Sequence, residues 1–208
     1  MEVINDLLNY KGMKIYQNNK WFLFSLDSVL LANFVNINKN VKKIIDLGTG
    51  NAPIPLFLST KTNAIITGVE IQKELADLAK KSVKINNLED RIFIDNIDIK
   101  QLSSIYNSDF FDTVVCNPPY FKIGEKSIYN SDIHKTIARH EVKITLEDII
   151  KQASYLLKNN GNFALIHRTD RLIDIIKLLG ENNLMPKRLQ FIYPKKGNES
   201  NLVLIEAT

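Results

Sequence analysis

The chain alternates short apolar runs, rich in Ile, Val, Leu and Phe, with longer segments in which apolar residues recur at helical spacing. The short runs predict strands at residues 43–47, 64–70, 91–95, 111–116 and 162–167. The longer segments predict helices that begin near Pro53 and span about 72–85, 100–106, 145–158 and 170–181. Strands and helices that alternate in this way are typical of a parallel sheet covered by helices on both faces.

Residue types at the segment ends support these boundaries. Pro53 suits a first helical position, because the backbone donor that it lacks would be unpaired there anyway. Asn86-Asn87 is expected to cap the preceding helix, and Thr145 with Asp148 forms a T-x-x-D variant of the capping box. Gly161 is expected to end the helix that this box begins.

The C-terminal part contains two further apolar runs, at 187–193 and 201–206, joined by the short linker Pro194-Lys195-Lys196-Gly197-Asn198. So short a connection predicts an antiparallel hairpin, because parallel neighbours need a long crossover. The predicted fold class is therefore α/β, with a seven-stranded sheet that is mostly parallel and ends in this hairpin.

A prefix of about forty residues precedes the first predicted core strand. Residues 13–16 and 21–24 predict a hairpin around Asn18-Asn19, and residues 28–34 predict a helix. Such a segment is too small to bury a core of its own. We therefore expect 1–38 to form a lid packed on a main domain at 39–208.

Composition and charge narrow the class of protein. Of 208 residues, 45% are hydrophobic and 24% charged, which fits a globular chain, and the formal net charge of +4 is compatible with a polyanionic partner. With Cys116 as the single cysteine, no internal disulfide forms, and no apolar run approaches the roughly 20 residues that span a bilayer. We expect a cytoplasmic protein with no membrane contact, and no sequence feature calls for an obligate protein partner.

The turn after the first predicted core strand reads Asp46-Leu47-Gly48-Thr49-Gly50-Asn51-Ala52-Pro53. Its glycines let the backbone approach a ligand at a helix N-terminus, although a plain structural turn explains them about equally well. A dinucleotide fingerprint needs a third glycine where Pro53 stands, so a nicotinamide or flavin enzyme is disfavoured.

Carboxylates follow the first three core strands. Glu70, twenty residues beyond Gly50, can accept hydrogen bonds from both hydroxyls of a ribose, and Asp98 can accept one from an adenine amino group. Taken singly, a solvated strand end and a helix N-cap explain them. Because ligands bind at the carboxyl ends of parallel strands, Asp46, Glu70 and Asp98 are expected to converge on one crevice.

The fourth core strand ends in Asn117-Pro118-Pro119-Tyr120, on the same predicted rim. An adenine amino nitrogen is a poor nucleophile, because its lone pair is delocalised into the ring. The Asn117 side-chain carbonyl and the Pro118 backbone carbonyl can accept hydrogen bonds from its two N–H groups. These hydrogen bonds pull the nitrogen toward tetrahedral geometry and so free the lone pair. The prolines stiffen the loop, and Tyr120 offers a ring on which a flipped base can stack. The alternative is a rigid loop that merely closes a strand.

From about Phe24 to Glu206 the sequence resembles the class I S-adenosylmethionine-dependent methyltransferases that carry an N-P-P-Y motif. It is most similar to the bacterial tRNA1(Val) adenine-N6 methyltransferase family, which modifies the adenine on the 3′ side of the anticodon. The stretches that carry this resemblance are 24–32, 46–55, 68–72, 116–121, 138–141 and 188–206.

This resemblance implies a Rossmann-like methyltransferase sheet, S-adenosylmethionine as cofactor, S-adenosylhomocysteine as product, no metal, and tRNA as substrate. It places Asp46, Gly48 and Gly50 at the methionine and ribose end of the cofactor, Glu70 at the ribose, and Ile71 and Asp98 at the adenine. It places the catalytic residues Asn117, Pro118, Pro119 and Tyr120 around the target base, with Asn117 also beside the cofactor. Ala52 replaces a glycine that is frequent in the family.

RNA contacts are assigned to basic loops that border the predicted crevice. The residues are Lys122, Lys126, Arg139, His140, Lys195 and Lys196. Arginine and lysine there can bind phosphates, although solvated lysines are the plainer explanation for each one. The three histidines and Cys116 match no zinc pattern, and Cys116, within a strand, is expected to be a small buried residue.

Two alternatives remain open at this point. The same tetrapeptide suits methylation of ribosomal RNA, DNA or a protein glutamine amide, because an amide nitrogen poses the same lone-pair problem. A non-catalytic RNA-binding subunit with a methyltransferase fold is the other alternative, and the intact motif at 117–120 argues against it.

Overall fold

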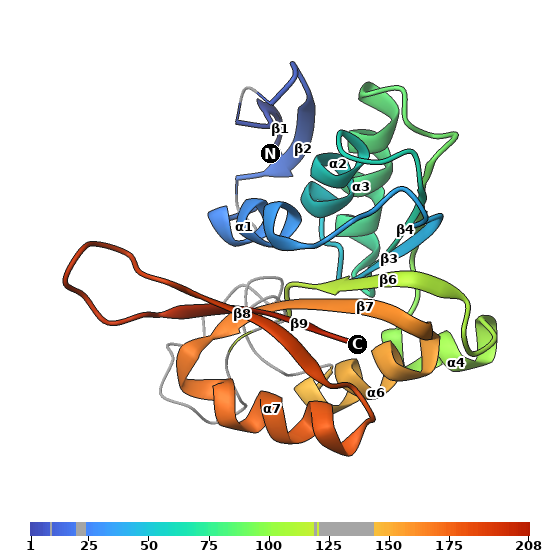
Figure 1. Ribbon diagram of the computed structural model, residues 1–208. Helices are drawn as coiled ribbons and strands as arrows, with labels where there is room; N and C mark the ends of the chain where they lie inside the picture. Colours follow the sequence, from blue (N-terminus) through green and yellow to red (C-terminus); the bar gives the residue numbers. More distant parts are fainter. Residues whose placement is uncertain (9, 20–23, 119, 121–143) are drawn as a thin grey trace.

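The computed structural model describes residues 1–8, 10–19, 24–118, 120 and 144–208. Seven strands of these residues form one sheet in the order β5-β4-β3-β6-β7-β9-β8 (Figure 1). Their bounds are β3 (Lys43–Leu47), β4 (Ile65–Val69), β5 (Ile92–Asp95), β6 (Phe111–Cys116), β7 (Leu157–Arg168), β8 (Pro186–Ile192) and β9 (Leu202–Ala207). β9 is antiparallel to both neighbours, and the other pairings are parallel. The predicted fold class and its C-terminal hairpin are confirmed.

Helices cover both faces of this sheet (Figure 1). One face carries α1 (Leu26–Phe34), α2 (Pro53–Ser59) and α3 (Lys73–Ile85), and the other carries α4 (Leu102–Ile105), α6 (Leu146–Leu156) and α7 (Leu172–Glu181). The short 3-10 helices η1 (Ile99–Gln101) and η2 (Thr169–Arg171) precede α4 and α7. Successive strand residues point to opposite faces, so Ile44 joins one apolar cluster and Ile45 the other.

The helix-end signals act as the sequence predicts, with one exception. Thr145 and Asp148 make both hydrogen bonds of a capping box at the start of α6. Asn86 caps α3 and Asn87 adopts a left-handed φ of 54°, while Pro53 opens α2.

The exception is Gly161, which does not end a helix. α6 ends at Leu156, and β7 begins at the next residue and contains Gly161. A Cβ at Gly161 would lie 2.8 Å from the Lys158 carbonyl oxygen, so only glycine fits beside this irregular stretch of the strand. The pairing of β7 with β6 shifts register across the same stretch. Tight packing, not helix termination, therefore explains this glycine.

The N-terminal hairpin differs from the prediction. β1 (Glu2–Asp6) pairs with β2 (Lys14–Asn18), and the connecting turn uses left-handed backbone at Lys11 and Gly12. Asn18 ends a strand instead of turning it, and residues 21–23 lie outside the described part of the chain. The reason is burial, because Leu7 and Ile15 are fully buried in the apolar cluster on that face.

Hydrogen bonds join this hairpin to α3. The Tyr16 N–H donates to Ser82 Oγ at 2.9 Å, and the Asn86 side chain bonds both the N–H and the carbonyl of Lys14. The division into a lid at 1–38 and a domain at 39–208 stays a prediction. Within the described residues, no helix combines the length and apolar character that a membrane span requires.

Candidate active site

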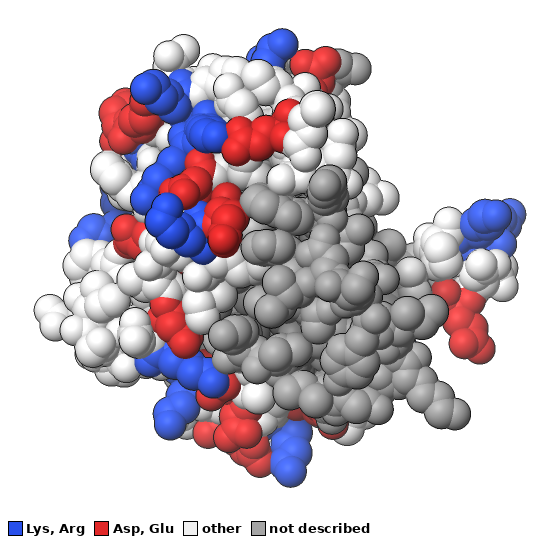
Figure 2. Space-filling view, turned by 180° about the vertical axis from the view of Figure 1, so that it is seen from behind, with Lys and Arg blue, Asp and Glu red and all other residues white. Residues whose placement is uncertain are grey.

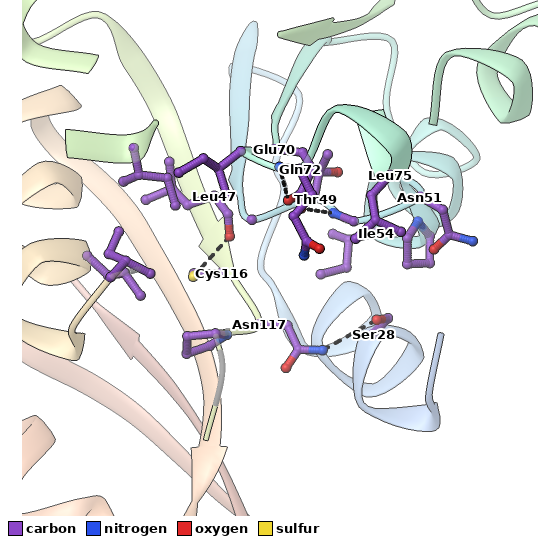
Figure 3. Close-up of a pocket in the computed structure, with 18 of the residues that line it drawn as sticks. Ser28, Leu47, Thr49, Asn51, Ile54, Glu70, Gln72, Leu75, Cys116 and Asn117 are labelled. Carbon is purple, nitrogen blue, oxygen red and sulfur yellow. Dashed lines mark hydrogen bonds between the residues drawn. The ribbon is translucent and has the colours of Figure 1, made fainter. Parts of the chain in front are cut away.

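A pocket opens where β3, β4 and β6 end, at the carboxyl edge of the sheet (Figure 3). It encloses about 1020 Å³ of empty space, including its open mouth. The residues that line it are Phe24, Ser28, Leu47, Gly48, Thr49, Gly50, Asn51, Pro53, Ile54, Glu70, Ile71, Gln72, Leu75, Asp98, Ile99, Cys116, Asn117, Pro118, Ile144 and Ile149. The structure thus brings the glycine turn, Glu70, Ile71, Asp98 and the start of the tetrapeptide to one place.

The glycine turn forms one wall of the pocket. Gly48 and Gly50 adopt left-handed φ angles of 76° and 59°, which a side chain would make costly. Ala52 also has a left-handed φ, of 69°, which explains physically why glycine suits this position. The N–H groups of Gly48 and Thr49 donate to the Val69 carbonyl at 2.9 and 2.8 Å, so the turn is fixed to the end of β4.

Glu70 holds the same turn from the side. Its carboxylate is buried, accepts the Gly50 N–H at 3.0 Å through Oε2 and accepts the Gln72 N–H at 2.8 Å through Oε1. Burial raises the pKa of Glu70, and these backbone donors oppose the rise. A carboxylate has about four lone-pair sites, more than these backbone donors occupy, so Glu70 keeps acceptor capacity for a ligand hydroxyl.

Asp46 does not line the pocket, contrary to the sequence prediction. Its side chain is fully buried behind the turn and accepts the Thr49 hydroxyl at 2.7 Å. The pKa of Asp46 is raised to about 7, chiefly by burial and to a smaller extent by the nearby Glu70 charge, while the Thr49 hydrogen bond opposes the rise. Asp46 therefore supports the turn from behind, and Thr49 presents the pocket surface in its place.

Asp98 and Ile71 border the opposite side. Asp98 Oδ1 accepts the Lys100 N–H at 2.9 Å, so this residue caps η1 and lines the pocket at once. Ile71 is exposed and offers an apolar surface. Asn96 ties these strand ends together, because its amide donates to the carbonyl oxygens of Glu70 and Ile71 at 2.8 and 3.1 Å.

The tetrapeptide begins directly after β6. Asn117 and Pro118 line the pocket, Tyr120 lies beside them, and Pro119 falls outside the described residues. The Tyr120 hydroxyl lies 2.8 Å from Asn117 Oδ1 and 2.8 Å from Asp27 Oδ2. Figure 3 shows the Asn117 amide pointing toward Ser28 on α1, and Nδ2 donates to Ser28 Oγ at 3.4 Å.

The Tyr120 ring is packed by a histidine from the next strand. His167, on β7, is fully buried with its ring centroid 5.3 Å from that of Tyr120. Burial, with a smaller contribution from the nearby Arg171 charge, lowers the pKa of His167 to about 4, so the ring is neutral at pH 7. Burial raises the pKa of Tyr120 well above its usual value, and the charge of Asp27 adds to that rise. Tyr120 therefore keeps its proton.

The predicted RNA-contacting residues divide into two groups. Lys122, Lys126, Arg139 and His140 lie outside the described residues. Lys195 and Lys196 are exposed in the turn of the β8–β9 hairpin, which projects from the body of the molecule (Figures 1 and 2). Its turn follows the carboxyl end of β8, which runs parallel to β7, so it lies at the same sheet edge as the pocket.

Several residues that line the pocket or contact the tetrapeptide had no role in the sequence prediction. Thr49 and Asn51 lie within the recognised glycine turn, and Asn51 also donates to the Tyr16 carbonyl at 2.7 Å, which ties the turn to β2. Asp27 and Ser28 lie in the stretch 24–32 that resembles the methyltransferases, but only the fold shows that they contact the tetrapeptide. Cys116 is fully buried, as predicted. Across the described ranges, no group of three or more His, Cys, Asp or Glu residues is placed to hold a metal ion.

Residues 25–182 match the family model for the methyltransferase small domain. The chain is 31% identical, over 97% of its length and 80% of the relative's, to a protein of Porphyromonas gingivalis named tRNA1(Val) (adenine(37)-N6)-methyltransferase.

Solved structures share the fold. A predicted O-methyltransferase from Agrobacterium tumefaciens superposes with a TM-score of 0.67 at 23% identity, covering 87% of this chain and 79% of the other. A geranyl diphosphate C-methyltransferase from Streptomyces coelicolor, in complex with Mg2+, geranyl diphosphate and S-adenosyl-L-homocysteine, superposes with a TM-score of 0.64 at 11% identity, covering 86% and 75%. These neighbours establish the methyltransferase fold.

Proposed function

The chain belongs to the methyltransferase small-domain family and is an S-adenosylmethionine-dependent methyltransferase, and from this premise we propose that it methylates the N6 amino group of an adenine in tRNA. The observation that carries the proposal is the Asn117-Pro118 pair at the mouth of the cofactor pocket. The name of the Porphyromonas gingivalis relative supports adenine 37 of tRNA1(Val) as the target.

The pocket suits S-adenosylmethionine chemically, a cofactor that supplies an electrophilic methyl group. We assign the ribose hydroxyls to Glu70. Backbone donors hold both of its oxygens in place, so the carboxylate is already oriented to accept further hydrogen bonds from the ribose. The free oxygen of Asp98 suits the adenine amino group, and Ile71 suits the face of that ring. Asp46 acts indirectly by holding Thr49 and the glycine turn.

The catalytic residues act by positioning and electrostatics. Asn117 Oδ1 and the Pro118 carbonyl accept hydrogen bonds from the two N–H groups of the target amine. These two hydrogen bonds direct the lone pair of the amine into the pocket. The Tyr120 ring, backed by His167, is the surface on which the flipped base stacks. Methyl transfer from the sulfonium would pass its positive charge to the target nitrogen, which would then be acidic enough to release one N–H proton to solvent, so the site needs no general base with a shifted pKa.

The RNA approaches from the edge where the β8–β9 hairpin projects. Lys195 and Lys196 are exposed in the turn of this hairpin and suit contact with phosphates. We place Lys122, Lys126, Arg139 and His140 with them on the basis of the sequence resemblance, and we propose that 1–38 acts as a lid. Because tRNA is the proposed substrate, the cytoplasm is the proposed site of action.

Radiolabelled methyl transfer onto unmodified valine tRNA tests this function. We expect label as N6-methyladenosine beside the anticodon, and Asn117→Ala should abolish transfer while leaving cofactor affinity nearly unchanged. Asn63→Ala, an exposed asparagine remote from the pocket, is the matched control and should behave as wild type. The same assay is run with ribosomal RNA and with a protein glutamine amide as acceptors. Label on one of these and none on tRNA would overturn the tRNA assignment, while the amine-methylation chemistry would stand.

A further inference from the structure

The first turn of α1 contacts the tetrapeptide through two side chains. Asp27 Oδ2 accepts from the Tyr120 hydroxyl, and Ser28 Oγ accepts from Asn117 Nδ2. These pairs lie 93 and 89 residues apart in the sequence, so they exist only because the prefix packs over the carboxyl edge of the sheet. Ser28 is buried and lines the pocket, which places this contact beside the reacting groups.

The Tyr120 hydroxyl has one proton and two oxygens within reach. Asp27 Oδ2 and Asn117 Oδ1 both lie at 2.8 Å, yet a phenol donates one hydrogen bond at a time. A carboxylate is the stronger acceptor, because hydrogen bonds to an ionised partner are roughly twice as strong as neutral ones. Asp27 therefore competes with Asn117 for this proton.

That competition affects the acceptor on which the methylation rests. If the Tyr120 proton pointed at Asn117 Oδ1, this oxygen would already be engaged when the target amine arrived. With the proton on the Asp27 side, the Tyr120 hydroxyl no longer donates to Asn117 Oδ1, and this oxygen stays available to the target amine. Ser28 supports this arrangement, because it accepts from Asn117 Nδ2 and so fixes which end of the amide is the oxygen.

We propose that Asp27 is a positioning residue that draws the Tyr120 hydroxyl away from Asn117, and so keeps the Asn117 carbonyl available to the target amine. The inference rests on the proposed function, because it concerns the same amine acceptor. Asp27 acts through Tyr120 and touches no reacting atom. The prefix thereby contributes to catalysis through a contact that no motif of the core contains.

The consequence is an unusual order of activities among three variants. In Asp27→Ala the Tyr120 hydroxyl donates to Asn117 alone, so the single-turnover rate of methyl transfer should fall about tenfold or more, with cofactor affinity unchanged. Tyr120→Phe keeps the stacking ring and removes the proton, so its loss should be smaller. Adding Tyr120→Phe to Asp27→Ala should restore the rate to that of Tyr120→Phe, because the competing donor is gone.

The matched control is Glu147→Ala. Glu147 occupies the second position of α6, as Asp27 does in α1, and is exposed, so it reproduces the loss of an acidic residue from a first helical turn. Its rate should equal that of wild type. If Asp27→Ala folds poorly, Asp27→Asn replaces it, because it keeps an acceptor oxygen without the charge and should lose less activity.

Two results would overturn the inference. One is a double variant whose loss is the product of the two single losses, because independent effects would show that Asp27 does not act through the hydroxyl. The other is full activity of Asp27→Ala. Failure of the proposed function is seen separately, as no transfer to tRNA by the wild-type protein. In that case urea unfolding tests the Asp27–Tyr120 hydrogen bond by itself. If the shifts in unfolding midpoint for Asp27→Ala and Tyr120→Phe simply add in the double variant, the two side chains do not interact.

Discussion

Most polar side chains of the pocket are already held by the protein itself. Glu70 is held by backbone donors, Thr49 by Asp46, Asp98 by the Lys100 N–H, and Asn117 by Ser28. Groups fixed in this way lose little further conformational entropy when a ligand binds. At the residue scale the site is therefore preorganised, and single substitutions should separate cofactor binding from methyl transfer.

Glu70→Ala should weaken S-adenosylmethionine binding about tenfold or more. The substitution removes the proposed ribose acceptor and leaves the Gly50 and Gln72 N–H groups without their partner, which loosens the glycine turn. Glu70→Gln, which keeps one acceptor oxygen, should lose less. Calorimetric titration measures both, with the exposed Glu74→Ala as control. Equal affinity for wild type and Glu70→Ala would remove Glu70 from the ribose site.

Asp46 predicts a defined dependence of stability on pH. Its pKa rises from 3.8 to about 7 on folding, so between these values the native state binds more protons than the unfolded state. Stability from this group is therefore present below pH 3.8 and is lost as the pH rises toward 7. As the pH rises from 3.8 to about 7, the urea unfolding midpoint of wild type should fall relative to that of Asp46→Asn. The His167 contribution, of opposite sign, is common to both proteins and cancels.

At the scale of elements, helix ends and turns place the site. α6 begins with its capping box just before Ile149, a lining residue, and the β3–α2 turn supplies the glycine wall. Gly68 on β4 has to be glycine for the same wall, because a Cβ there would lie 2.8 Å from the Thr49 side chain. Capping and turn residues therefore shape the pocket indirectly, because they set where the helices and strands that line it begin and end.

Thr145→Ala should lower the free energy of unfolding by about 1 kcal/mol, the usual cost of removing a helix N-cap. The Thr145 hydroxyl accepts the Asp148 N–H at 3.1 Å, and the variant leaves that donor without its cap. Urea unfolding measures the change, with Ser103→Ala, an exposed position in α4, as control. An unchanged midpoint would mean that the capping box contributes nothing to the stability of α6.

At the scale of the whole molecule, the pocket and the β8–β9 hairpin turn lie at one edge of the sheet. Figure 2 shows acidic and basic side chains interspersed over the face it presents. On this face the described residues form no basic patch, so a local group of lysines elsewhere is the better candidate for guiding RNA. The β8–β9 hairpin meets this need, because it carries Lys195 and Lys196 at the pocket edge.

The double substitution Lys195→Ala/Lys196→Ala should weaken tRNA binding. It should also reduce the slope of log Kd against log salt concentration by about one to two, since fewer counterions are released. Cofactor affinity should not change. Filter binding at several salt concentrations measures the slope. Lys80→Ala/Lys81→Ala removes two adjacent exposed lysines from α3 and serves as the charge-matched control. Equal slopes for the two double variants would remove the hairpin from the RNA interface.

The sequence by itself determined the sheet, its helices and the residues of the glycine turn and the tetrapeptide. These features depend on local periodicity, on helix caps and on short motifs, which a chain expresses within a few residues of each other. The same reasoning placed Glu70 and Asp98 correctly at the pocket, because the carboxyl ends of neighbouring parallel strands must share one edge.

The tertiary structure alone decided which of these residues face the pocket and which support it. Asp46 belongs to the glycine motif but is buried behind it, while Asp27 and Ser28 belong to the prefix but contact the tetrapeptide. The N-terminal hairpin pairs 2–6 with 14–18 because this register buries Leu7 and Ile15 against the core. Such outcomes depend on packing between segments distant in sequence, which no local pattern encodes.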